Sequence, residues 1–360
     1  IVTNIDGGFN FGSSGDNRID DTNISTTSVA NDLNYESFDY FTYNGIKTNF
    51  EISLKNINAM SDKSTKYKNT PQSELMSAYF MNASFPLEKD TEDRLNTLTP
   101  KISFRVSPHD MKNHSNSSRR IDVKNVFSNN RLGIGDSFET GESVTLGIDF
   151  KKEKINQVFQ INEIDGSFDY EKEKVEEIEK YFDFKLATVL RFNKEKNIPI
   201  NSTIDEKGSN IFGLVGYKPN KNTSLNYDFS LTNDFDIIEH HTINASYISE
   251  NFSTDFSFTE TAGILGDTNL VSFEQKIMNF NDFHNFTFAT RRNRKINLTE
   301  YYNLVYEYKN DCLIAGIKYR KDYYKDNDII PKEELFFSIT IIPFYTFSPD
   351  KMILNKNRID

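Results

Sequence analysis

Apolar and polar residues alternate with a period of two along much of this chain. In the segment SLNYDFSLTND, residues 224–234, Leu225, Tyr227 and Phe229 alternate with Asn226 and Asp228. Successive side chains of a β-strand point to opposite faces of a sheet, so this pattern predicts strands with one apolar and one polar face. The same pattern recurs at 44–56, 142–150, 251–260, 300–311, 312–321 and 334–342.

The predicted strands are longer than is usual in soluble sheets. We count about fifteen, most of about 8 to 13 residues, whereas strands of soluble proteins average ~5 to 6 residues and tilted membrane-spanning strands need ~9 to 11. Only residues 170–181 have the pattern of an amphipathic helix, and that segment is mostly charged. The sequence therefore predicts an all-β, antiparallel transmembrane β-barrel, with a soluble aromatic-rich β-protein as the alternative.

The connections between the predicted strands alternate between short and long. The short ones are 44–45, 218–223, 249–251, 279–283 and 310–311. The long, polar ones are 57–73, 107–142, 193–208, 259–269 and 321–334. Outer-membrane barrels have short periplasmic turns and longer outer loops, so this asymmetry favours a barrel over a sandwich. The charged insertion at 151–181 is an exception, unless it holds one extra hairpin around 158–171.

The composition further limits the class of protein to which this chain can belong. The chain has 31 Phe and 18 Tyr but no Trp, which suits a lipid-facing band and its girdles except for the missing Trp. Its richest apolar run, 339–347, is too short for a spanning helix and contains Pro343. A net charge of -11 without a basic tail or stripe argues against a nucleic-acid partner. Because the chain begins at Ile1, we expect a mature protein or a fragment of one.

The sequence contains no arrangement typical of catalysis or metal binding. The five His residues lack ligand spacing, and no phosphate-binding loop or nucleophile motif is present. We therefore expect no catalytic residues, no metal and no cofactor. The one compact basic cluster is Arg291, Arg292, Arg294 and Lys295, which the alternation of connections places at the long-connection end. These side chains either contact phosphates of a surface glycolipid or form a solvated basic turn.

Several segments together resemble the lipopolysaccharide-assembly family LptD. They are LTPKISFRVSP at 98–108, NVFSNNRLGIGDSFETGESVTLGIDF at 125–150, FDFKLATVLRF at 182–192, KGSNIFGLVGYKP at 207–219 and the segment 306–344. The second of these is the most specific. The resemblance extends over nearly the whole chain from about residue 35 onward.

The resemblance implies an outer-membrane barrel of about twenty-six strands in a Gram-negative bacterium, of which this chain supplies the C-terminal part. Residues 35–344 are then barrel, residues 1–34 a polar loop and the start of the fragment, and residues 345–360 a C-terminal tail. The implied partners are lipopolysaccharide, an LptE-like lipoprotein plug in the lumen, periplasmic lipopolysaccharide bridge proteins and outer-membrane lipids. An N-terminal periplasmic domain and the first strands are expected outside this sequence.

The resemblance also implies a lateral seam, where the first and last strands of the barrel meet. The last strand is expected at 335–344, with Leu335, Phe337, Ile339 and Ile341 on one face and Pro343 near its end. Proline cannot donate to a strand ladder, so Pro343 either weakens the seam or merely ends the strand.

Cys312 is the only cysteine, and it is expected at the tight-turn, periplasmic end. Members of the family often have two adjacent cysteines there, linked to the N-terminal domain. Cys312 is therefore a candidate for one half of such a disulfide, with a free thiol as the alternative.

These observations favour a non-enzymatic translocon that inserts lipopolysaccharide into the outer leaflet through the lateral seam. A general porin or ligand-gated outer-membrane receptor is the first alternative. A secreted β-protein with an adhesive or lectin-like function is the second.

Overall fold

The computed structural model describes residues 7–19, 25–63, 67–91, 93–163, 170–263, 266–323, 332–341, 345–347 and 352–353. These residues form β-strands and their connections, together with a short 3₁₀ turn at Ile200–Ser202. A search of the described residues finds no helix with the length and hydropathy of a membrane span. The chain divides into unit 1, Ile1–Leu214 with Ser230–Ile237, and unit 2, Val215–Phe229 with Ile238–Asp360.

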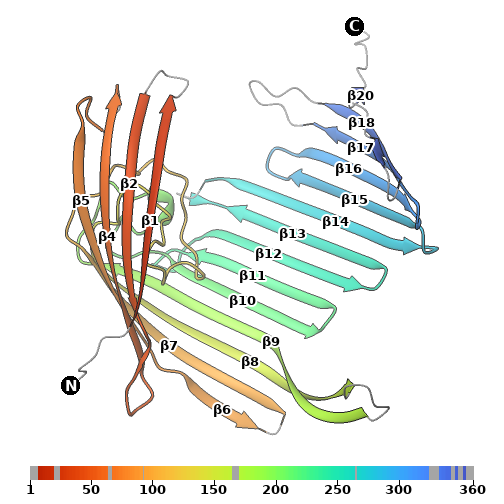
Figure 1. The fold of residues 1–360 in the computed structure, drawn as a ribbon, viewed down its shortest axis with the longest axis horizontal. Helices are drawn as coiled ribbons and strands as arrows, with labels where there is room; N and C mark the ends of the chain where they lie inside the picture. Colours follow the sequence, from red (N-terminus) through yellow and green to blue (C-terminus); the bar gives the residue numbers. More distant parts are fainter. Residues whose placement is uncertain are drawn as a thin grey trace. The chain divides into compact units, whose positions relative to one another are not determined.

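Unit 1 is an antiparallel arrangement of long strands with two short ones (Figure 1). Its strands are β1 (Gly7–Ile19), β2 (Ser25–Ser37), β3 (Tyr40–Phe41), β4 (Lys47–Asp62), β5 (Gln72–Ser84), β6 (Leu87–Thr91), β7 (Arg94–Ser107), β8 (Gly141–Glu163) and β9 (Tyr170–Arg191). The long strands pair in the order β1, β2, β4, β5, β7, β8, β9. The hairpin of β10 (Ile211–Asn220) and β11 (Thr223–Leu231) is divided between the two units.

Unit 2 continues with antiparallel hairpins between neighbours in the sequence. Its remaining strands are β12 (Ile238–Ser249), β13 (Phe252–Thr261), β14 (Thr268–Phe280), β15 (His284–Asn293), β16 (Leu298–Lys309), β17 (Leu313–Asp322), β18 (Glu333–Ile341), β19 (Tyr345–Phe347) and β20 (Met352–Ile353). The predicted all-β, antiparallel class is confirmed, and the strand lengths are those of membrane-spanning strands.

The alternation of connections is visible within each unit. In unit 1 the connection at 108–140, between β7 and β8, is by far the longest. In unit 2 the connections at 262–267 and 323–332 lie at one end of the strands, and the tight ones at 250–251 and 310–312 lie at the other. The predicted Asn44–Gly45 turn is also confirmed, with Gly45 at a φ of +82° that favours glycine.

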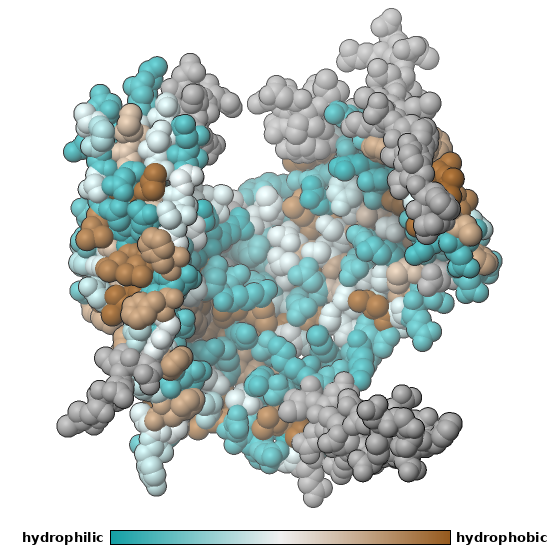
Figure 2. All heavy atoms as spheres, in the orientation of Figure 1, coloured by the Kyte–Doolittle hydropathy of each residue, from teal (hydrophilic) through white to brown (hydrophobic). Residues whose placement is uncertain are grey.

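The strands bury polar side chains and expose apolar ones. In β7, Ser103 is 2% exposed, whereas its neighbours Ile102 and Phe104 are 47% and 41% exposed. In β16, Leu304 is 48% exposed. Figure 2 shows apolar side chains gathered over β1, β2 and β4 on the face turned to the viewer. Exposed apolar faces of this extent are unfavourable in water and are typical of a surface that contacts lipid.

The core of unit 1 is formed by connections rather than by two packed sheets. The connection at 108–140 and residues 192–210 between β9 and β10 pack on one face of the strands, which is polar in β7 and β8 and partly apolar in β9 and β10 (Figure 1). Their buried apolar side chains contact those of β9 and β10; the cluster is Met111, Ile121, Val123, Val126, Leu132, Ile134, Ala187, Val189, Ile198, Ile204, Phe212 and Leu214. This core covers the face of the sheet that a water-filled lumen would otherwise wet.

Two N-terminal strands correct the expectation of a polar loop at residues 1–34. β1 and β2 pair over their full length, from Gly7 opposite Ser37 to Ile19 opposite Ser25. Their alternation is hidden in the sequence because Gly, Ser and Asn occupy many positions, but Phe9 and Phe11 still share one face with Tyr35 and Leu33. The remaining domain boundaries stay predictions.

The insertion at 151–181 is a continuation of β8 and β9 and not a separate hairpin. The two strands pair from Ser143 opposite Arg191 to Glu163 opposite Tyr170, with an irregularity after Lys152. The helix-like pattern at 170–181 is thus part of a strand, since pairing with β8 overrides the local charge pattern. Residues 164–169 lie outside the described residues.

Candidate functional site: a buried charge cluster under the longest connection

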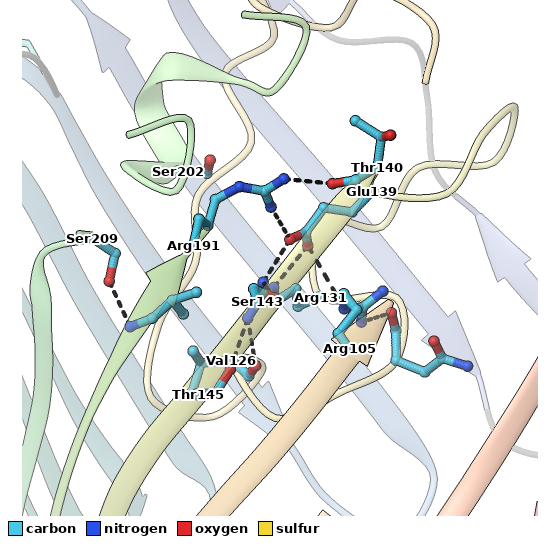
Figure 3. Close-up of polar contacts among 12 residues, drawn as sticks. Arg105, Val126, Arg131, Glu139, Thr140, Ser143, Thr145, Arg191, Ser202 and Ser209 are labelled. Atoms are coloured by element: carbon cyan, nitrogen blue, oxygen red, sulfur yellow. Dashed lines mark hydrogen bonds and ion pairs between the residues drawn. The ribbon is translucent and has the colours of Figure 1, made fainter. Parts of the chain in front are cut away.

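Four charged side chains meet where the 108–140 connection contacts the strands (Figure 3). Arg131 and Glu139 come from the connection, Arg105 from the end of β7 and Arg191 from the end of β9. All four are buried, with exposed fractions between 2% and 6%. The ends of two strands and one long connection therefore converge on a single carboxylate.

Glu139 is the centre of this arrangement. Arg131 donates from Nε to Oε2 of Glu139 at 2.7 Å and from Nη2 to Oε1 at 2.5 Å, which is a bidentate pair. Arg191 donates from Nη1 to the same Oε1 at 2.6 Å and from Nη2 to the carbonyl oxygen of Thr140. Nε of Arg105 lies 3.9 Å from Oε2.

The cluster contains more positive than negative charge. Burial by itself raises the pKa of the Glu139 carboxyl, but the surrounding guanidinium groups outweigh this and lower the pKa to about 2. Glu139 is therefore ionised at neutral pH. Nε of Arg105 has no hydrogen-bond partner, although Nη2 of Arg105 donates to the carbonyl oxygens of Ser128, at 2.9 Å, and Asn129.

Small polar side chains of β8 complete the coordination of Arg131. Its Nη1 donates to Oγ1 of Thr145 at 2.9 Å, and its Nη2 donates to Oγ of Ser143 at 3.0 Å. Serine and threonine at alternate positions of β8 thus supply acceptors on the covered face. This is the polar half of the alternating pattern, here used to bind an arginine.

Glycine is required where the connection enters β8. Gly141 has a φ of +82°, and a Cβ atom there would lie 2.9 Å from Nη2 of Arg191. A side chain at this position would be strained by the positive φ and would crowd Nη2 of Arg191, which donates to the carbonyl oxygen of Thr140. The sequence Glu-Thr-Gly therefore places the carboxylate and turns the chain into the strand within three residues.

The arrangement binds one segment of the chain to another. Its hydroxyl groups, those of Ser143 and Thr145, accept from Arg131, and among the described residues no group of three or more His, Cys, Asp or Glu side chains could hold a metal ion. Ion pairs and hydrogen bonds of this kind fix the position of a connection, and here they hold 108–140 on the polar face of β7, β8 and β9.

The structure places the predicted seam residues on β18, but β18 is not the last strand. β19 pairs with Ile339–Ile341, and β20 pairs with Glu334 and Leu335, both on the edge opposite β17. The four apolar seam residues share one face, on which Phe337, Ile339 and Ile341 are exposed. The strand ends at Ile341, and Pro343 lies outside the described residues.

The basic cluster lies at the predicted end of the strands, in and beside the connection between β15 and β16. Its charges are not equivalent. Arg291 forms an ion pair with Glu300, and Lys295 forms one with Asp267. Arg292 donates instead to the neutral amide of Asn297.

Cys312 is exposed in the tight connection between β16 and β17. Its backbone N–H donates to Oδ1 of Asn310 at 3.0 Å. It lies at the end opposite the 323–332 connection, as predicted. Its disulfide stays a prediction.

Sequence reasoning did not single out Arg105, Arg131, Glu139 or Arg191 as one cluster. A signal was present, because Arg105 and Arg191 occupy polar-face positions near strand ends where Ser and Thr are the usual neighbours. An arginine there requires a buried anion. The partner could not be identified from spacing, since Glu139 is far from both strand residues in the sequence.

Long antiparallel strands with an exposed apolar face, and in unit 1 an opposite face covered by its own connections, define the class: an outer-membrane β-barrel protein. The family model LptD, described as LPS transport system D, matches residues 47–263, which are more than half of the chain. The chain belongs to this family. The matched region includes the whole charge cluster, whereas the basic cluster, Cys312 and β18 lie beyond it. No match was found among the curated proteins.

Proposed function

We propose that this chain forms part of the barrel wall through which lipopolysaccharide reaches the outer leaflet of the outer membrane of a Gram-negative bacterium. Lipopolysaccharide transport is the function of the LptD family, and LptD proteins reside in the outer membrane. The observation that carries the proposal is a reversal of burial: strands such as β7 bury their polar side chains and expose their apolar ones. A lipid environment stabilises exposed apolar side chains in such numbers.

The lateral seam is proposed at the far edge of β18. β18 pairs with β17 along its whole length, from Leu313 opposite Ile341 to Lys321 opposite Glu333. On its other edge it pairs only with the short β19 and β20 among the described residues. A strand edge with few ladder hydrogen bonds separates at a lower cost than a full ladder, which supports an opening here.

The partners follow from the same proposal. Lipopolysaccharide is the cargo, periplasmic bridge proteins deliver it, and an LptE-like lipoprotein occupies the lumen. Cys312 is proposed to form a disulfide with an N-terminal periplasmic domain, which its exposed position in the tight connection would permit. No covalent chemistry on the cargo is required, so the proposed activity is transport without catalysis.

Depletion of the full-length protein tests the proposal. Newly made lipopolysaccharide is expected to accumulate in the inner membrane, and the surface is expected to lose it, as measured by membrane fractionation and labelling of surface sugars. Restoration by the wild-type gene is the control. Normal surface display after depletion would refute the proposed function.

A further inference from the structure

The basic cluster of unit 2 separates into a pair of side chains that form ion pairs and a pair that form none, although Arg294 still interacts electrostatically with Glu260. Arg291 and Lys295 each form an ion pair with an acidic side chain of a neighbouring segment. Among the described residues, no ion pair is formed by Arg292 or Arg294. Two of the four positive charges are therefore available to an external anion.

Arg292 and Arg294 line the same hollow, which has a volume of about 680 Å³. The rest of its lining contains no carboxylate and is formed by Val271, Phe273, Thr290, Asn297, Thr299 and Tyr302. The hollow thus combines two guanidinium groups with uncharged polar groups and with an apolar and aromatic part, here called its floor. A small inorganic anion would use the first feature but not the second.

The hollow lies on the apolar face of β14, β15 and β16. Phe288 connects its floor residues, with ring centroids 6.5 Å from Phe273 and 6.3 Å from Tyr302. Phe286 and Leu304 on the same face are 38% and 48% exposed. This is the face that the reversal of burial assigns to lipid, so a ligand in the hollow would be a neighbour of the acyl chains.

The opposite face of the same strands is polar. There, Ser272, Glu274 and Tyr301 line a separate hollow that also receives Asp255 from β13. Arg291 lies on this side, where its guanidinium is 5.5 Å from the ring of Tyr301. Adjacent arginines of β15 therefore serve different surfaces, and only Arg292 and Arg294 are placed at the lipid side.

We propose that the hollow lined by Arg292 and Arg294 binds the phosphorylated headgroup of a glycolipid in the outer leaflet. This rests on the proposed function, which places the long-connection end of the strands at the cell surface. Guanidinium groups bind phosphate oxygens through paired, charge-assisted hydrogen bonds, and the aromatic floor would contact the sugar or the first part of an acyl chain. The site is two strands away from β18, so the bound lipid is a lipid of the barrel wall, separate from cargo at the seam.

The test uses the full-length protein with its native partners in nanodiscs, and native mass spectrometry to measure bound lipid. The probes are a diphosphorylated glycolipid, the same glycolipid without phosphates, and phosphatidylglycerol. The double variant Arg292→Ala/Arg294→Ala is expected to lose about tenfold in affinity for the phosphorylated glycolipid, and Arg292→Lys/Arg294→Lys is expected to restore part of it. The matched control is Arg291→Ala/Lys295→Ala, which removes the same number of charges from the neutralised pairs.

Equal retention of the phosphorylated glycolipid by the Arg292/Arg294 variant and the control would overturn the proposal. So would equal binding of the dephosphorylated glycolipid, or binding of phosphatidylglycerol as tight as that of the glycolipid. Heat-modifiable migration in gels confirms that each variant folds. If the Arg292→Ala/Arg294→Ala variant loses the glycolipid but still transports lipopolysaccharide, the binding site stands independently of transport. If that variant retains the glycolipid, the proposed site is refuted whether or not transport fails.

Discussion

Units 1 and 2 use the same alternating strands but differ in what covers the polar face. In unit 1 that face lies under the 108–140 and 192–210 segments, which bring their own apolar core and a buried charge cluster. All buried apolar side chains of the described residues, except Ala289, belong to unit 1. In unit 2 the connections are shorter, and the polar face retains an open hollow lined by residues such as Ser272 and Glu274.

The alternation of residues in the strands determines the environment of only one face of such a sheet, the apolar one. The apolar face of both units is exposed for lipid, because it alternates in the same way. The polar face depends on the connections. Where a connection is long enough to fold back, it must satisfy the buried Ser, Thr and Arg groups that it covers, and Glu139 does this for three arginines.

The largest expected effect is in unit 1, from Glu139→Ala. Three buried guanidinium groups would lose their carboxylate, and breaking a buried ion pair costs about 3–5 kcal/mol. We expect a large loss of folded protein in the membrane, measured by heat-modifiable migration and thermal unfolding in detergent. The matched control is Glu142→Ala, an exposed acid in the same segment. Equal stability of the two variants would show that the buried charge cluster does not stabilise unit 1.

The core under the connection is tested by Ile198→Ala. Ile198 is fully buried, and truncation of a buried isoleucine to alanine costs about 2–5 kcal/mol through lost contacts and a cavity. Ile200→Ala serves as the control, since Ile200 is 43% exposed two residues further on. Thermal unfolding of both variants in detergent should show a clear decrease for the first only. A similar decrease for both would argue that the connection does not form a core.

The pH dependence of unit 1 sharpens the role of Glu139. Its pKa is lowered from an ordinary value near 4.5 to about 2, so its contribution is complete above pH 4.5 and is lost as pH falls towards 2. A shift of this size corresponds to about 3 kcal/mol. The difference in unfolding free energy between wild type and Glu139→Gln should therefore shrink across this window. If the difference in unfolding free energy stays constant over this pH range, the ionised Glu139 carboxylate is not the source of the stabilisation.

The shared feature of the two units, the lipid-facing side, is tested by Leu304→Arg in unit 2. An arginine on the lipid face costs about 2–4 kcal/mol at the bilayer midplane and less near the interfaces. Asn303→Arg is the control, because residue 303 lies on the opposite face of β16. Each variant is inserted into lipid vesicles and its unfolding free energy is measured. Leu304→Arg should be less stable than Asn303→Arg. If Asn303→Arg is the more damaging, the two faces of β16 have been assigned the wrong way round.

The smallest expected effect is that of Cys312→Ser. Cys312 is exposed in a tight connection, and surface substitutions of this kind change stability by about 0.5 kcal/mol or less. Barrel stability should be unchanged, whereas the proposed disulfide would disappear from the intact mass of the unreduced full-length protein. A free thiol in the wild type would refute the disulfide and leave the barrel assignment intact.

Much of the fold was predictable from sequence because a strand records its two faces in alternate residues. Segments such as 224–234 and 300–311 confirm this, and Cys312 lies at the predicted end. The expectation of a polar loop at residues 1–34 did not hold for the described residues 7–19 and 25–34, where Gly, Ser and Asn obscure the alternation of β1 and β2. The prediction was also wrong about the end of the sheet, because β19 and β20 are too short to leave a periodic signal.

The candidate site was much less predictable. Arg105, Arg131, Glu139 and Arg191 are spread over strands and connections, and only the folding of 108–140 brings them together. Similarly, the sequence grouped Arg291 to Lys295 as one basic cluster, whereas pairing with Glu300 and Asp267 leaves Arg292 and Arg294 distinct.

The strands, their antiparallel order and their apolar face can be predicted from the sequence, because alternation and connection length are local properties of the chain. What covers the polar face, and which charges are paired, follows only from the three-dimensional fold. Those outcomes depend on contacts between residues distant in sequence, where one buried carboxylate offsets the desolvation of several arginines.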